Sequence, residues 1–372
     1  MSDTTHIETT LTPPRGAWRF NAAKGQVRLS EQLSARRAAC RQLNNITPDT
    51  PERVKSMLRV WGIEPMRHPD GSINLDPDTG LAYLADFEQA RTWANIARFE
   101  WHPANKVVNA LKPFIRAARD AGTDIIEPDY KFAKTGRLVI SRYPVHSLPK
   151  TERHLLTPVH GNTVVAGDWS SLELRIVAAF SEDETLRQWY HDGLDPFALL
   201  GTELNTDRVV IKRVIYGLIY GAGERTTASQ IGVSINGAKQ LRHDILTRLH
   251  GVATWRDNTI RQAKVDRHVI SAAGRRIDLT DPLKPDTDLS YRAPNYLVQA
   301  SGVDLLTRAV SLLTEQRSAP PELTWHDAIY LTTNNPERAK RALEETMTDT
   351  PDWMNGINLA ADITTGRNLA CT

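Results

Sequence analysis

Four side chains spaced four residues apart constrain this chain more than any other feature. They are Arg208, Lys212, Tyr216 and Tyr220. At about 3.6 residues per turn, this spacing predicts a helix over residues 208–220 that carries all four along one face. Two cations followed by two aromatic rings suit a ligand with phosphates at one end and a flat base at the other. A helix buried in a core would carry Leu, Ile or Val there, so the stripe predicts a nucleotide-binding surface.

Two aspartates accompany apolar, strand-like runs far from this helix in sequence. Asp168 follows residues 163–166, and Asp327 lies within residues 323–332. A carboxylate at the end of a buried strand is costly unless it is paired or binds a cation. If the fold brings the two together, divalent ions about 3.5–4 Å apart would offset their repulsion and support nucleotidyl transfer. The alternative is that Asp168 caps a helix starting at Ser170 and that Asp327 occupies a hairpin turn.

The composition narrows the class of protein. The chain has 372 residues, 40% of them hydrophobic, so it can bury a large core divided among two or three substructures. The net charge of +2 leaves nucleic-acid binding open, because local placement of charge matters more than the total. Two cysteines at opposite ends argue against a disulfide framework or a zinc site. No apolar run approaches the ~20 residues needed to cross a bilayer, and no signal-peptide pattern is present. We therefore expect a cytoplasmic protein with no membrane partner.

Helical patterns dominate the first 130 residues and the middle of the chain, and strand patterns flank the middle. Residues 1–27 are polar without a clear period, and we expect them to form an arm. The periodicity predicts helices over residues 29–43, 51–61, 81–100, 105–121, 185–200, 208–220, 295–314 and 337–346. It predicts strands or strand-and-turn segments over residues 163–166, 269–277, 323–332 and 357–363. A small sheet interrupted by a long helical insertion indicates an α+β fold.

Three segments taken together resemble the motifs of the family A DNA polymerases, the bacterial DNA polymerase I type. The run from Asp168 to Ile176 resembles motif A. The stripe from Arg208 to Gly221 resembles motif B, and His326 with Asp327 resembles motif C. Their order and gaps also fit, and an ordered set is far more specific than any one motif. Shorter matches accompany them at residues 135–138, 274–276 and 295–299.

The resemblance implies a right-hand architecture whose palm contains the small antiparallel sheet. The implied parts are an N-terminal arm (1–35), a thumb (36–130), a palm (131–185 and 268–372) and fingers (186–267). Since these parts use nearly the whole chain, we expect a polymerase module that lacks proofreading and 5′ nuclease domains. Primer–template DNA and dNTPs are the implied partners, with a separate exonuclease or processivity subunit as a further candidate.

The resemblance also assigns the catalytic roles. Asp168 and Asp327 would bind two Mg²⁺ ions, or Mn²⁺ in their place, with help from the backbone carbonyl of Trp169. Arg208 and Lys212 would hold the triphosphate, and Lys212 would donate a proton to the departing pyrophosphate. These roles fit phosphoryl transfer, in which catalysis consists mainly of positioning and charge neutralisation.

Substrate-contacting roles follow in the same way. Tyr216 would stack on the incoming nucleotide, and its hydroxyl predicts tolerance of dideoxynucleotides. Tyr220 would lie at the templating end, and Glu173 would crowd the sugar's 2′ position and exclude ribonucleotides. The implied DNA contacts are Arg137, Asn295 and Gln299 in the minor groove, Arg275 and Arg276 on template phosphates, and His326 at the primer end. Each of these also has a plainer interpretation as a surface cation, a solvated helix face or a turn.

Two departures from the family pattern keep alternatives open. Ala328 follows Asp327 where motif C usually has a third carboxylate, and residues 194–197 lack the His that often follows Asp195 and helps to hold phosphate. One alternative is therefore a catalytically weak primer–template binding subunit of a split replication or repair polymerase. The other is a single-subunit RNA polymerase, which Glu173 and Tyr216 argue against.

Overall fold

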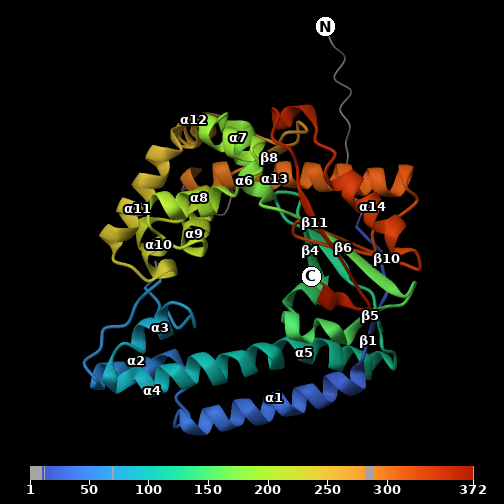
Figure 1. The fold of residues 1–372 in the computed structure, drawn as a ribbon. Helices are drawn as coiled ribbons and strands as arrows, with labels where there is room; N and C mark the ends of the chain where they lie inside the picture. Colours follow the sequence, from blue (N-terminus) through green and yellow to red (C-terminus); the bar gives the residue numbers. More distant parts are fainter. Residues whose placement is uncertain (1–10, 12, 69–70, 281–288, 372) are drawn as a thin grey trace.

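The fold is described from a computed structural model, which describes residues 11, 13–68, 71–280 and 289–371. Helices and small antiparallel sheets form separate parts of the molecule, so the predicted α+β class is correct. Figure 1 shows three regions: a layer of N-terminal helices, a helical unit from the middle of the chain, and a central sheet with its own helices. Within the described residues, none of the helices is both long and apolar enough to span a membrane.

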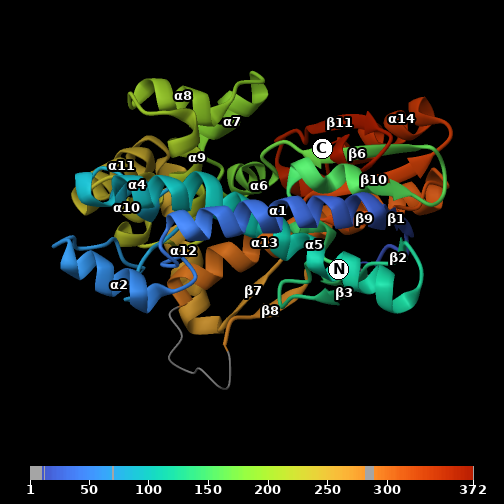
Figure 2. The ribbon, with the colours of Figure 1, turned by 90° about the horizontal axis from the view of Figure 1, so that it is seen from below.

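Two long helices, α1 (Ala22–Gln42) and α5 (His102–Ala121), lie side by side along one side of the molecule (Figures 1 and 2). Before α1, β1 (Trp18–Phe20) pairs in antiparallel fashion with β2 (Ile125–Ile126) and β5 (Leu156–Pro158). The side chains of Trp18 and Phe20 are fully buried. Within the segment expected to form an arm, residues 18–20 thus form a buried strand and residues 22–35 belong to α1. The strand has no sequence signal, because three residues are too few to show an alternating pattern.

At the far end of these helices lie α2 (Pro51–Val60), α3 (Gly80–Leu84) and α4 (Glu88–Ile96). A π-helical turn (Ala97–Trp101) then leads into α5. The predicted single helix over residues 81–100 is wrong, since residues 85–87 interrupt it after α3. This end of the molecule has a hydrophobic core of its own, whose largest members are Leu43, Leu58, Leu81, Leu84, Trp93 and Trp101.

The central sheet contains β6 (Thr163–Trp169), β9 (Leu323–Trp325), β10 (Ala328–Thr333) and β11 (Ala361–Gly366). All neighbours are antiparallel, in the order β11-β6-β10-β9. The predicted strand over 357–363 starts later, at Ala361. The pairing register places Asp168 opposite Ala328 on one side and opposite Asp362 on the other.

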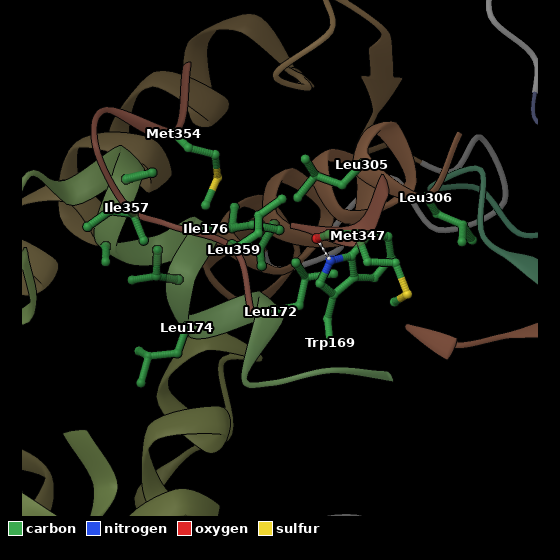
Figure 3. Close-up of a cluster of buried hydrophobic side chains, with 14 of the residues drawn as sticks. Trp169, Leu172, Leu174, Ile176, Leu305, Leu306, Met347, Met354, Ile357 and Leu359 are labelled. Atoms are coloured by element: carbon green, nitrogen blue, oxygen red, sulfur yellow. Dashed lines mark hydrogen bonds between the residues drawn. The ribbon is translucent and has the colours of Figure 1, made fainter. Parts of the chain in front are cut away.

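Both faces of the central sheet are covered, and the alternation of β6 decides which residues face which layer. Val164 and Ala166 pack with residues of α5 and β1, whereas Val165 and Trp169 pack with the helices of the opposite layer. That layer contains α6 (Leu172–Ser181), α13 (Leu289–Ser311) and α14 (Pro336–Met347). Figure 3 shows its core, in which the Trp169 indole nitrogen donates a 2.6 Å hydrogen bond to the carbonyl oxygen of Met347. This bond fixes the end of β6.

The helical unit comprises α7 (Glu184–His191), α8 (Pro196–Glu203), α9 (Arg208–Ile219), α10 (Glu224–Ile231), α11 (Ile235–Arg248) and α12 (His250–Asp266). The predicted helix over residues 185–200 is two helices, because a turn precedes Asp195 and Pro196, which start α8. Two hairpins complete the described fold, formed by β3 (Asp129–Phe132) with β4 (Leu138–Arg142) and by β7 (His268–Ile270) with β8 (Arg276–Asp278).

Candidate active site

Asp168 and Asp327 are brought together by two adjacent strands. Asp168 is near the end of β6, and Asp327 lies in the two-residue turn that joins β9 to β10. His326 in this turn has a positive φ of 50°, a conformation that few residues other than glycine adopt. The backbone amide of Trp169 donates to the carbonyl oxygen of Asp327 at 3.3 Å, which ties the two segments together.

Burial and neighbouring negative charge act on both carboxylates. Burial raises the pKa of Asp327 to about 6, and the charges of Glu173 and Asp168 add to this effect while Arg137 opposes it. Burial also raises the pKa of Asp168, with a further contribution from the charge of Asp362. The two groups therefore form a region of negative charge that favours a bound cation.

The residues present fit divalent metal ions. The Asp168 side chain makes no hydrogen bond or ion pair with any described residue. Across the same described part of the chain, Asp, Glu, His and Cys form no cluster of three or more with metal-ligand geometry. Mg²⁺ is commonly held by one or two carboxylates together with substrate phosphates, so two aspartates suffice where a triphosphate completes the coordination. Asp168 and Asp327 are therefore suitable protein ligands.

Glu173 sits beside these aspartates in the first turn of α6. Its side chain is only 8% exposed, and Arg137 Nη2 lies 2.6 Å from its Oε1. The same nitrogen lies 3.7 Å from Oδ1 of Asp327, so one guanidinium group contacts both carboxylates. The hydroxyl of Tyr220 donates to the other oxygen of Glu173. Burial and the Glu173 charge raise the pKa of Tyr220, which keeps this hydroxyl protonated as a donor.

Three residues of the predicted stripe, Arg208, Lys212 and Tyr216, lie on α9, and the fourth, Tyr220, is its C-cap. In α9 the opposite face is buried through Ile211, Val214, Ile215 and Leu218. The rings of Tyr216 and Tyr220 stack with centroids 6.0 Å apart at an interplanar angle of 20°. Lys212 Nζ lies 5.7 Å from the centroid of the Tyr216 ring, and the charges of Lys150 and Lys212 partly offset the rise in the pKa of Asp168. Lys212 of α9 therefore acts electrostatically on the strand-end carboxylate of Asp168.

Three of the residues expected to contact DNA lie close to the site. Arg137 lies beside the carboxylates, whereas Asn295 and Gln299 are in α13. The side-chain oxygen of Gln299 accepts a hydrogen bond from Thr135 Oγ1 at 3.4 Å. The side-chain oxygen of Asn295 is buried without a hydrogen-bond partner. Arg276 is exposed and pairs with Asp278 at 3.0 Å.

Arg275 is engaged within the protein. Its Nε lies 2.7 Å from Oδ1 of Asp304, whose side chain is 5% exposed, and its Nη2 donates to the carbonyl of Ala300 at 2.7 Å. These bonds attach the β7–β8 turn to α13. The predicted contact of Arg275 with template phosphates remains a prediction.

Sequence patterns did not single out two residues at this site. His146 lines a cavity of about 190 Å³ with Arg137, His326 and Asp327, and burial together with the His326 charge lowers its pKa. Asp362 faces Asp168 across β11 and β6 and accepts a 2.9 Å hydrogen bond from Ser170 Oγ. The only local signal for Asp362 was a single carboxylate in an otherwise strand-like segment.

The comparisons with known proteins agree with this geometry. The polymerase ("POL") domain of Pol1 from M. smegmatis, solved in complex with DNA primer–template and dNTP, matches 96% of this chain and 68% of that chain. The TM-score is 0.81 at 19% sequence identity, so the fold is that of a right-hand polymerase module. The sequence model described as DNA polymerase family A matches residues 64–371. The chain belongs to the family A DNA polymerases.

Two relatives show how much of a family member is present. The DNA polymerase of Mycobacterium phage D29 is 31% identical over 209 residues, which is 53% of this chain and 33% of the phage protein. DNA polymerase I of Aquifex aeolicus is 24% identical over 289 residues, covering 72% of this chain and 47% of the relative. The chain therefore spans between a third and a half of the length of these relatives.

Proposed function

We propose that this protein is a template-directed DNA polymerase that adds dNTPs to a primer 3′-hydroxyl with two Mg²⁺ ions. The observation that carries the proposal is the meeting of Asp168 and Asp327 beside the cationic and aromatic face of α9. Family membership supports the same activity, and the M. smegmatis structure is described with primer–template and dNTP.

In this proposal the N-terminal helices, residues 36–130, act as a thumb. Residues 131–185 and 268–372 form the palm, and residues 186–267 form the fingers. The phage and bacterial relatives suggest action in the cytoplasm of a bacterial or phage-infected cell, with an exonuclease or processivity subunit as a candidate partner.

The chemistry is an in-line displacement at the α-phosphorus of the dNTP. The primer 3′-oxygen forms the new P–O bond, the bond to pyrophosphate breaks, and the hydroxyl proton is lost to solvent. Two Mg²⁺ ions held by Asp168, Asp327 and the Trp169 carbonyl would supply charge that stabilises the attacking and leaving oxygens. Arg208 and Lys212 bind the triphosphate, and Lys212 donates a proton to the departing pyrophosphate.

Selectivity depends on groups that the protein holds in place. Arg137 and Tyr220 fix Glu173 from two sides, so its carboxylate can crowd a 2′-hydroxyl without moving away. Tyr216 stacks on the nucleotide's sugar and base, and Tyr220 lies at the templating end. The remaining proposed DNA contacts are Arg137, Asn295, Gln299, Arg275, Arg276 and His326.

The direct test is extension of a labelled DNA primer on a DNA template with Mg²⁺ and either dNTPs or rNTPs. Asp168→Ala and Asp327→Ala should abolish extension with dNTPs, whereas Asp129→Ala, at an exposed position of β3, should not. Preferential use of rNTPs by the unaltered protein would indicate an RNA polymerase instead. Tight primer–template binding without extension in Mg²⁺ or Mn²⁺ would indicate a binding subunit.

A further inference from the structure

The ring of Phe197 in the first turn of α8 lies against both cations of the α9 stripe. Its centroid is 5.7 Å from Cζ of Arg208 and 5.8 Å from Nζ of Lys212. The same ring is 5.9 Å from that of Tyr216, and the Phe197 side chain is fully buried. Cations within about 6 Å of a ring centroid are attracted to the negative face of the ring. One neutral side chain thus contacts three members of the stripe.

The backbone of Phe197 is fixed by the same carboxylate that holds Arg208. Asp195 Oδ1 accepts a 2.9 Å hydrogen bond from the Phe197 amide, while Asp195 Oδ2 accepts a 2.6 Å bond from Arg208 Nε. The Asp195 side chain therefore links the backbone of the first turn of α8 to the side chain of Arg208 at the start of α9. The Asp195 cap thus fixes the backbone position from which the Phe197 ring extends.

A ring and a carboxylate hold a cation in different ways. A carboxylate neutralises the charge and occupies N–H donors, as Asp195 does with one nitrogen of Arg208. A ring face orients the cation but accepts none of its directional hydrogen bonds, so the donors stay available for a ligand. The Lys212 ammonium makes no hydrogen bond or ion pair with any described residue, and it lies at nearly equal distances from the ring centroids of Phe197 and Tyr216, 5.8 and 5.7 Å.

We propose that Phe197 is a positioning residue for the nucleotide's triphosphate. Its ring holds Arg208 and Lys212 side by side before the nucleotide arrives, and it leaves the Lys212 ammonium and the two terminal nitrogens of Arg208 available for the phosphates. Pre-organised cations lose less conformational freedom when the phosphates bind, so the ring should strengthen binding with little effect on the chemical step. This inference rests on the proposed function, because it assigns the α9 cations to a triphosphate.

The test replaces Phe197 with mono-, di- and trifluorinated phenylalanine by nonsense suppression in the full chain. Fluorination weakens the ring's negative face stepwise while nearly preserving its shape. The KM for dNTP should rise stepwise by ~2- to 5-fold in total, the range expected for one cation–π contact, with kcat unchanged. The same series at Phe114, a fully buried ring that packs against Phe20 at a tilt of 34°, is the matched control and should leave KM constant.

A second measurement separates this inference from the proposed function. The Kd of inorganic tripolyphosphate, measured by calorimetry across the Phe197 series, should rise in the same steps. A flat series in both KM and tripolyphosphate affinity would overturn the role of the ring, whether or not the protein extends primers. Stepwise weakening of tripolyphosphate binding in a protein that does not extend primers would uphold the ring's role and overturn only the polymerase proposal.

Discussion

Asn74 Nδ2 lies 2.7 Å from Ser229 Oγ, although the two residues are 155 positions apart in sequence. The bond joins the segment before α3 to helix α10, which Figure 1 shows meeting at one end of the molecule. Asn74 is almost fully buried, and its side chain also accepts from the Asp76 amide and donates to Thr79 Oγ1. The N-terminal helices and the helical unit that carries the α9 stripe therefore touch directly.

A cavity of about 700 Å³ lies around this contact. Its lining includes Asp76 and Asp78 from the segment before α3, and Lys212, Arg213 and Tyr216 from α9. The lining thus combines carboxylates from one part with cations from the other. The attraction between these opposite charges favours the contact between Asn74 and Ser229, and salt weakens that attraction where solvent enters the cavity.

Ser229→Ala should loosen this contact while leaving the segment's internal bonds intact. A hydrogen bond of this type contributes ~1 kcal/mol, so local opening should become roughly fivefold more frequent. Hydrogen–deuterium exchange of residues 71–80 should therefore accelerate by about this factor. Thr226→Ala on the same helix lines the cavity without making a side-chain hydrogen bond to a described residue, and it should have no such effect. Unchanged exchange in Ser229→Ala would show that the bond does not hold the two parts together.

Arg137→Met should destabilise the fold through the carboxylates that it leaves behind. Glu173 is nearly buried and would lose its 2.6 Å ion pair, and Asp327 would lose its nearest described cation. Leaving such groups without a charged partner costs ~1–3 kcal/mol. Urea denaturation of the metal-free protein at pH 7 measures this loss.

Arg142→Met provides the matched comparison for Arg137. Its ion pair with Asp129 spans 3.6 Å and both side chains are more than 60% exposed, so its loss should change stability by less than ~0.5 kcal/mol. Equal effects of the two substitutions would mean that Arg137 is an ordinary surface cation.

Tyr216→Phe should increase discrimination against dideoxynucleotides. The Tyr216 hydroxyl makes no hydrogen bond with a described residue, so it is available to a bound nucleotide. If it lies near the 3′ position of the sugar, it replaces a hydrogen bond that a dideoxynucleotide cannot make. Loss of one such bond corresponds to about tenfold in relative kcat/KM. Competition between ddNTP and dNTP in primer extension measures this ratio, with Tyr83→Phe as a distant hydroxyl deletion. No change in the ratio for Tyr216→Phe would refute the proposed position of the hydroxyl.

Local sequence patterns predicted the parts of the site that each lie within one element. The α9 stripe and the two strand-end aspartates were found because helical spacing and apolar runs are visible in short windows. Asp362 and His146 were missed because strand register and loop packing bring them to Asp168 and His326 from distant parts of the chain. The partner of Arg275 could not be predicted for the same reason, since Asp304 lies on the next helix.

Short or irregular elements were missed for a different reason. The strand formed by residues 18–20 has only two inward side chains, Trp18 and Phe20, and its partners lie more than a hundred residues away. The break between α3 and α4 contains no Gly or Pro to mark it. The fold class could be predicted because it depends on the long helices and on β6 and β10, whose patterns are unambiguous.

Asp327→Asn should abolish primer extension yet stabilise the metal-free protein at neutral pH. In the folded state burial raises the pKa of Asp327 to about 6 from its ordinary value of 3.8. The unfolded chain therefore releases this proton at lower pH, and folding stability is lost as the pH rises from about 4 to about 6. Asn cannot ionise, so the substitution removes a penalty of at most about 3 kcal/mol at pH 7.

The pH dependence distinguishes this effect from a general change in packing. Relative to the unaltered protein, Asp327→Asn should show its full gain in stability at pH 7. The gain should vanish below about pH 4, where the Asp327 carboxyl is protonated and is as neutral as the amide that replaces it. Urea denaturation in EDTA at both pH values measures it, with Asp129→Asn as the exposed control. Mg²⁺ added at pH 7 should narrow the difference, since a cation bound at Asp327 relieves the same penalty in the unaltered protein. A gain of equal size at both pH values would mean that the Asp327 carboxylate carries no ionisation penalty in the folded protein.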